Sequence, residues 1–173
     1  MKRNIAIICL DRSLSRATAG LVADQLEMRF FDMRDLFVFD HKPRDFKEMI
    51  TTYGSKYYRK KEDSLLRFAS GFENVVYNID SDCLYKKDLL KKLGTEYLVV
   101  YLHLNASLAG RIIEKEEYSC YKEKTMYTLS KDQLIKRIET AKANADIEIN
   151  VSSMSAFKAS SEVLRAINKY YGI

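Results

Sequence analysis

Apolar runs with the character of buried strands alternate along the chain with longer stretches of helical periodicity. The strand-like runs lie at 5–9, 29–31, 74–77, 97–102 and 147–151. The helix-like stretches lie at about 15–27, 44–70 with a break near Gly54, 84–93, 106–117, 130–144 and 155–171. Strands that alternate with helices favour parallel pairing, because parallel neighbours need a long crossover connection. The pattern predicts an α/β fold with three α/β/α layers around a five-stranded parallel sheet.

The composition indicates one domain in a reducing compartment. The 173 residues are 47% hydrophobic, include 6 Gly and 1 Pro, and contain no linker-like tract, so residues 1–173 are expected to form a single domain. Three cysteines without C-x-x-C spacing argue against a disulfide framework. The basic N-terminus has too few apolar residues after it for a signal peptide or a membrane span. We therefore expect a cytoplasmic protein.

A formal net charge of +5 favours anionic partners, although 24 acidic residues are interspersed with 29 basic ones. The densest basic and aromatic segment, 53–61, is expected to be a solvated helix face rather than a nucleic-acid interface. No H-E-x-x-H and no paired Cys/His spacing occurs, so no metal site is predicted.

Residues 9–16, C-L-D-R-S-L-S-R, stand where the phosphate-binding loop G-x-x-x-x-G-K-[ST] would join a strand to a helix. Such a loop needs glycine because its backbone N–H groups curl around phosphate with positive φ angles. Cys9 and Leu14 take the glycine positions, and Ser15 and Arg16 take those of the lysine and the hydroxyl. The residues still able to contact a nucleotide are Arg12, Ser13, Ser15 and Arg16. We expect the two serines to be helix-capping hydroxyls rather than nucleophiles.

Five stretches, spread over nearly the whole chain, share their order and spacing with a known family. They are N-I-A-I-I-C, D-Q-L-E-M-R-F-F-D-M-R-D-L, Y-G-S-K-Y-Y-R-K-K-E, G-T-E-Y-L-V-V-Y-L-H-L and K-R-I-E-T-A-K-A-N-A-D-I. Their succession resembles the shikimate kinases, small P-loop kinases that phosphorylate a hydroxyl of shikimate from ATP with magnesium. The resemblance implies a P-loop NTPase-like fold of the shikimate kinase type.

The resemblance also implies residues that bind the substrate carboxylate. Arg59 and Glu62 match an Arg and a Glu that follow the family's Y-G-x-x-Y/F-F/Y segment, and Arg137 matches a second arginine before the last strand. A planar guanidinium suits a carboxylate because it donates two parallel hydrogen bonds. An ordinary helix-surface ion pair between Arg59 and Glu62, three residues apart, is the alternative.

Departures from the family pattern fall on the positions of the chemistry. In the family's D-x-D segment Asp32 is kept, but the second acid is replaced by Arg34, which cannot accept a hydrogen bond. Asp35 is one place too far on, about 100° around a helix, to replace it. A triple-glycine turn is replaced by I-D-S at 79–81. The lid-like insertion at about 114–128 lacks the R-P-L-L-like segment, and we expect either a mobile lid or a surface loop there.

These departures predict a degenerate kinase homologue. Phosphoryl transfer depends on a phosphate cradle, a loop lysine, magnesium and a lid arginine, and this chain replaces nearly all of them. We expect no catalytic residue and no cofactor. The expected ligand is a small anionic metabolite, held by Arg34, Arg59 and Arg137 with Asp32 and Glu62 beside them.

Two other functions stay open. One is an active kinase of the shikimate kinase type, in which Arg12 and Arg16 replace the missing lysine and bind ATP with magnesium in an altered way. The other is a scaffold that binds a protein partner through the lid region and the 53–61 helix. The sequence names no such partner and predicts no membrane association.

Overall fold

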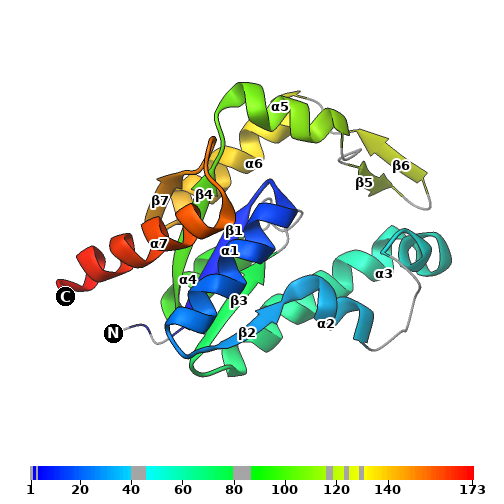
Figure 1. Cartoon of the computed structure of the whole chain (residues 1–173). Helices are drawn as coiled ribbons and strands as arrows, with labels where there is room; N and C mark the ends of the chain where they lie inside the picture. Colours follow the sequence, from blue (N-terminus) through cyan, green and yellow to red (C-terminus); the bar gives the residue numbers. More distant parts are fainter. Residues whose placement is uncertain are drawn as a thin grey trace.

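A computed structural model describes residues 2, 4–39, 46–79, 87–115, 119–122, 125–128 and 131–173 of the chain (Figure 1). Five described strands pair in parallel in the order β2-β3-β1-β4-β7, and two more form an antiparallel hairpin. The sheet strands are β1 (Asn4–Cys9), β2 (Arg29–Asp32), β3 (Val75–Ile79), β4 (Tyr97–His103) and β7 (Ile147–Asn150), and the hairpin strands are β5 (Ser119–Lys122) and β6 (Thr125–Thr128). The predicted α/β fold is confirmed.

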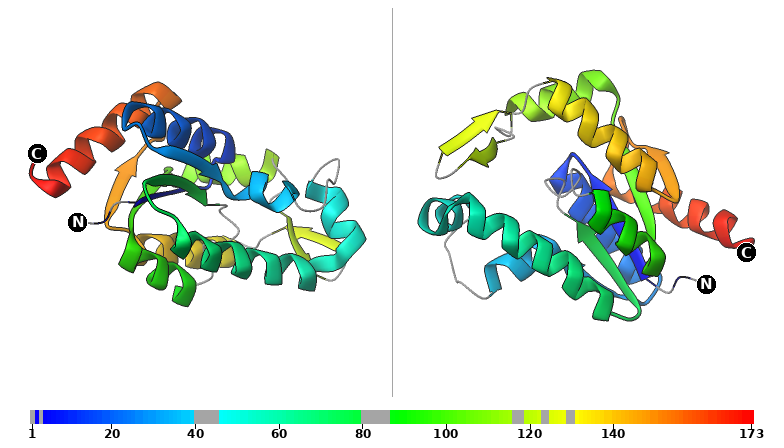
Figure 2. Two further views of the ribbon diagram at one scale, coloured as in Figure 1. Left: turned by 90° about the horizontal axis from the view of Figure 1, so that it is seen from below. Right: turned by 180° about the vertical axis from the view of Figure 1, so that it is seen from behind.

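Helices cover both faces of the sheet (Figure 2). The helices are α1 (Arg12–Gln25), α2 (Met33–Phe39), α3 (Phe46–Phe68), α4 (Lys87–Glu96), α5 (Ala106–Lys115), α6 (Lys131–Asn144) and α7 (Ala156–Tyr171), with a 3₁₀ turn η1 (Ala69–Gly71). Helices α1 and α7 pack together on one face, and α3, α4 and α6 lie on the other. This is the predicted three-layer arrangement.

The core lies around the three central strands. Every residue of β1 and β3 is buried, and β4 is buried from its first residue to its sixth. Burial on both faces explains why these strands read as continuous apolar runs rather than alternating ones. The large side chains buried there include Tyr77, Tyr97 and Tyr101. The Tyr97 hydroxyl donates a hydrogen bond to the Ala69 carbonyl at 2.6 Å, so this buried polar atom is satisfied.

Most element boundaries agree with the sequence predictions, and three features differ. Helix α1 begins at Arg12, three residues earlier than predicted, and α2 and the β5–β6 hairpin were not predicted. The break in α3 is confirmed, since Gly54 has φ 80° and ψ 162°. Residues 116–118 and 123–124 of the predicted insertion, and 80 and 81 of the I-D-S turn, lie outside the described residues. No helix in the described part of the chain has the length and apolar character to cross a membrane.

Candidate anion-binding site

A cavity of about 200 Å³ lies where the carboxyl ends of β1, β2 and β3 meet. From β1 the chain enters α1 on one face of the sheet, whereas the helix that follows the adjacent strand β3 lies on the other face. Such a divergence opens a crevice at the carboxyl edge of a parallel sheet, the usual place for a ligand. The lining residues are Cys9, Arg12, Ser13, Ser15, Arg16, Asp32, Arg34, Asn78 and Ile79.

The segment that stands in the place of a phosphate loop is the start of an ordinary capped helix. Two residues, Leu10 and Asp11, join β1 to α1. Asp11 is the N-cap, and its Oδ1 accepts a hydrogen bond from the Leu14 backbone N–H at 2.9 Å. Its carbonyl accepts the Ser15 N–H at 2.8 Å, which closes the first helical turn. The expectation that Ser13 and Ser15 cap the helix is wrong, because both lie inside α1.

This helix start differs from a glycine-rich phosphate loop. A helix N-terminus binds phosphate through its free N–H groups and its positive dipole end. Here the carboxylate of Asp11 already accepts the Leu14 N–H and places a negative charge at that end. Residues 12–16 are helical and contain no glycine, so their backbone cannot curl around an anion.

In the cavity wall, three polar side chains form a buried hydrogen-bonded series. The Ser15 hydroxyl donates to Asn78 Oδ1 at 2.6 Å, and Asn78 Nδ2 donates to Asp32 Oδ2 at 2.7 Å. Asp32 Oδ1 accepts the backbone N–H of Arg34 at 2.9 Å. These hydrogen bonds connect α1, β3 and the β2–α2 junction and leave none of these buried groups unsatisfied.

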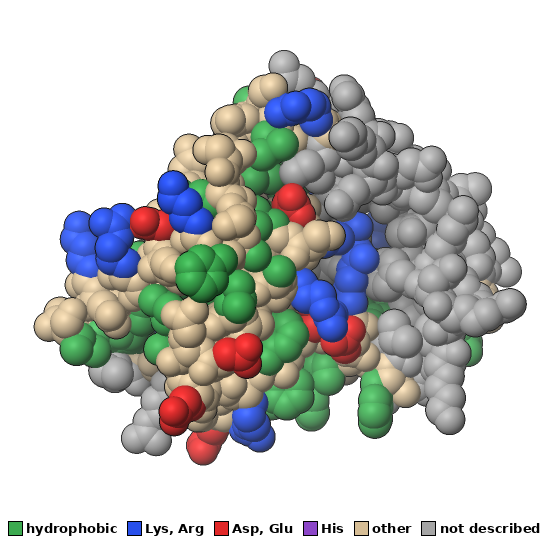
Figure 3. Space-filling model, in the orientation of Figure 1, with side chains coloured by type: hydrophobic (Ala, Val, Ile, Leu, Met, Phe, Trp, Pro, Cys, Tyr) green, Lys and Arg blue, Asp and Glu red, His purple; other side chains and the backbone are tan. Residues whose placement is uncertain are grey.

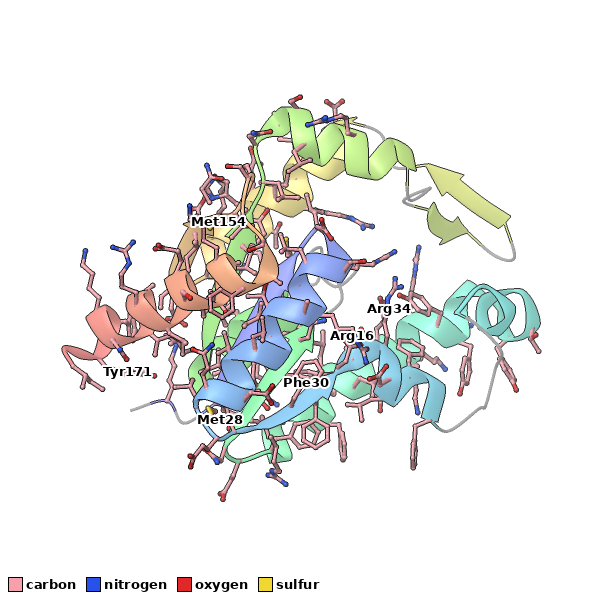
Figure 4. All side chains as sticks on the ribbon, viewed as in Figure 1. Arg16, Met28, Phe30, Arg34, Met154 and Tyr171 are labelled. Atoms are coloured by element: carbon pink, nitrogen blue, oxygen red, sulfur yellow. The ribbon has the colours of Figure 1, made fainter. Side chains whose placement is uncertain are left out.

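Arg16 links these hydrogen-bonded side chains to an ion pair at the mouth of the cavity. Its guanidinium donates two hydrogen bonds to Asp35, at 2.8 and 2.7 Å, and lies 3.3 Å from Asp32 Oδ1. The hydrogen bonds with Asp35, together with the charge of Asp32, raise the pKa of Arg16. Basic side chains lie beside acidic ones near the centre of this face in Figure 3, and Figure 4 shows Arg16 close to Arg34.

The same pair of carboxylates does not fit a magnesium ion. Asp32 and Asp35 are both engaged by Arg16, and the described residues contain no group of three or more His, Cys, Asp or Glu side chains placed to hold a metal. Magnesium is usually held by one or two carboxylates together with the substrate's phosphates.

The structure brings six of the sequence-predicted site residues to the cavity and leaves three elsewhere. The six are Arg12, Ser13, Ser15, Arg16, Asp32 and Arg34. On α3, Arg59 is exposed and Glu62 is fully buried, while Arg137 is buried on α6, and none of the three lines the cavity. Sequence reasoning missed Asn78. Its signal was a single amide in the otherwise apolar run of β3.

Comparison with known proteins identifies the family of this chain. The shikimate kinase family profile matches residues 16–168. The chain belongs to the shikimate kinase family. The part of the chain that the family profile matches begins at Arg16, after the Asp11 cap. A shikimate kinase of Alkaliphilus oremlandii is 29% identical over 108 residues, which span 62% of this chain and 63% of that relative.

Solved shikimate kinases share the fold at low sequence identity. The enzyme from Aquifex aeolicus superposes with a TM-score of 0.74 at 19% identity, over 95% of this chain and 96% of that one. The enzyme from Acinetobacter baumannii, solved in complex with shikimate, gives 0.75 at 14% identity, over 96% and 93% of the two chains. The family scaffold is therefore kept.

Proposed function

We propose that this shikimate kinase homologue binds a small anionic metabolite in the arginine-lined cavity and does not transfer phosphate from ATP. The observation that carries the proposal is the Asp11 cap. It occupies the helix N-terminus at which a nucleotide's phosphates would bind, in a segment with no glycine. Without that grip the chain lacks the positioning on which phosphoryl transfer depends.

The lining of the cavity supports the anion. The lining residues include three arginines, Arg12, Arg16 and Arg34, and one acidic residue, Asp32. Guanidinium groups donate hydrogen bonds in a fixed fork that matches carboxylate and phosphate oxygens. The Acinetobacter baumannii relative is described with shikimate, which carries a carboxylate, so shikimate is the first metabolite to test.

The test is isothermal titration of the full chain with ATP, with and without magnesium, and separately with shikimate, succinate and inorganic phosphate. We expect no heat from ATP and binding of at least one small anion. Transfer of labelled phosphate from ATP to shikimate would overturn the loss of kinase activity and support the alternative in which Arg12 and Arg16 replace the loop lysine.

Arg34→Ala is predicted to weaken anion binding roughly tenfold or more, because it removes a charged donor from the cavity. Arg165→Ala is the matched control. Arg165 is exposed on α7, pairs with Glu162, and does not line the cavity, so its loss should leave the dissociation constant unchanged. Equal affinities of the Arg34→Ala variant and the wild type for every bound anion would refute the assignment of this cavity.

The sequence-derived assignment of Arg59 and Arg137 is tested in the same series. Neither lines the cavity, so the proposal relies on Arg12 and Arg34. If Arg59→Ala or Arg137→Ala abolishes binding and Arg34→Ala does not, the binding site lies near α3 and α6 instead.

A further inference from the structure

We propose that the guanidinium of Arg16 is a built-in cation that replaces a divalent metal in this cavity. The ligand of the cavity is then a compact oxyanion with few hydroxyl groups, bound without metal. This inference rests on the proposed anion-binding function and adds the chemical class of the ligand.

The first observation is that both oxygens of the Asp32 carboxylate already accept hydrogen bonds from the protein. Its Oδ1 accepts the Arg34 N–H at 2.9 Å and the Asp35 N–H at 3.4 Å, and lies 3.3 Å from Arg16. Its Oδ2 accepts the Asn78 amide at 2.7 Å. The side chain is buried, so a new ligand would have to displace one of these partners.

The second observation is the position of Arg16. In the loop pattern G-x-x-x-x-G-K-[ST], the last residue places its hydroxyl on magnesium, and Arg16 stands at that place in residues 9–16. Its guanidinium forms a two-bond pair with Asp35 and lies 6.0 Å from the centre of the Phe30 ring. A fixed positive charge thus lies against two carboxylates that would otherwise attract a metal ion.

The third observation is that the polar acceptors of the cavity wall are used internally. Asn78 Oδ1 accepts the Ser15 hydroxyl at 2.6 Å, and both oxygens of Asp32 are engaged. The guanidinium groups of Arg12 and Arg34 can donate but cannot accept. A ligand hydroxyl needs an acceptor for its proton. The hydroxyls of Ser13 and Ser15 can supply one, but the three lining guanidinium groups offer many more donors, so this wall favours a ligand rich in acceptors and poor in donors.

The size of the cavity agrees with a compact ligand. Its volume of about 200 Å³ lies below the roughly 300–1,000 Å³ typical of sites for drug-sized molecules. A small dicarboxylate or a single oxyanion suits such a volume.

The test compares succinate with tartrate, which has the same carbon chain and two added hydroxyl groups, by calorimetry on the full chain. Each titration is done with EDTA and again with excess magnesium. We expect succinate to bind at least as tightly as tartrate, and magnesium to change either dissociation constant by less than about twofold.

The outcomes separate this inference from the proposed function. Binding of tartrate or shikimate about tenfold tighter than succinate, or binding that requires magnesium, would overturn the ligand class while the anion-binding function stands. If none of these anions binds, and sulfate does not bind either, both the ligand class and the anion-binding function are overturned.

Arg16→Gln tests the built-in cation directly, since glutamine keeps hydrogen-bond donors but not the charge. We expect Mn²⁺ to raise the melting temperature of this variant and to leave that of the wild type unchanged. Arg165→Gln, at the exposed α7 pair, is the matched control and should behave as the wild type does. If Mn²⁺ shifts the melting temperature of the Arg16→Gln variant and of the wild type equally, Arg16 does not take the place of a metal ion. If the variant does not fold, the titrations of the wild-type chain still decide the inference.

Discussion

One aspartate caps α1 and closes its first turn. The Asp11 side chain accepts the Leu14 N–H, and its carbonyl accepts the Ser15 N–H, so the first turn of α1 closes on the chain's own atoms. A carboxylate at this end also interacts favourably with the helix dipole. The cap and the helix dipole thereby stabilise the segment as a helix.

Asp11→Ala is predicted to lower the free energy of unfolding by about 1 kcal/mol, because the Leu14 N–H loses its acceptor. Urea denaturation monitored by circular dichroism measures the change. Asp11→Asn is the matched control, since asparagine caps helices about as well as aspartate, and its effect should be a few tenths of a kcal/mol. Equal losses in the two variants would mean that the charge, rather than the cap, stabilises the helix.

At the scale of residues, sequence reasoning found the cavity arginines but not their partners. The family resemblance pointed to Arg34, and the loop pattern pointed to Arg12 and Arg16. The chain from Ser15 through Asn78 to Asp32 joins positions 63 and 46 residues apart, and no local pattern encodes such contacts. Arg59 matched the family by position, yet it is exposed on α3 and does not line the cavity.

At the scale of elements, the long periodic segments were predictable and the short ones were not. The strands β1 and β4 were found because both faces are buried, which leaves a continuous apolar run. Helix α2 spans seven residues, too few for a helical period to be recognised. The start of α1 was misplaced because the segment was compared with a loop, although Asp11 before a helical run is itself an N-cap signal.

Gly54→Ala is predicted to destabilise the protein by about 1–3 kcal/mol. The kink in α3 holds this residue at φ 80° and ψ 162°, a conformation that is essentially restricted to glycine. Thermal unfolding followed by calorimetry measures the loss.

Gly20→Ala is the control for that experiment, because Gly20 lies inside the regular helix α1 and an added Cβ would meet nothing within 4 Å. It should stabilise the chain by up to about 1 kcal/mol. A Gly54→Ala variant as stable as the wild type would show that α3 can straighten.

At the scale of the whole molecule, buried tyrosines link the stability of the sheet to alkaline pH. Tyr97 and Tyr101 lie on β4, one of the three central strands, and burial raises the pKa of both hydroxyls well above the ordinary value. The folded protein therefore holds these protons after the unfolded chain has begun to release them. Stability should be fully present below about pH 10 and should decrease as the pH rises above it.

Tyr97→Phe is predicted to lower stability at neutral pH by about 1 kcal/mol, because the hydrogen bond to the Ala69 carbonyl is lost. Above about pH 10 its stability should decrease less steeply than that of the wild type, since one buried proton is no longer involved. Urea unfolding between pH 8 and pH 11 measures both effects. Tyr170→Phe, at an exposed position on α7, is the control and should keep the wild-type slope. Parallel pH profiles for all three proteins would contradict the role of burial.

The Asp11 cap bears on how the stability of α1 responds to the ATP concentration in the cell. A loop that is ordered by a bound nucleotide becomes more stable as the nucleotide concentration rises, by RT ln(1 + [L]/Kd). Asp11 supplies its negative charge from within the chain, so it cannot dissociate. Under the proposed function, the first turn of α1 is therefore held equally well whether the cell is rich in ATP or starved of it.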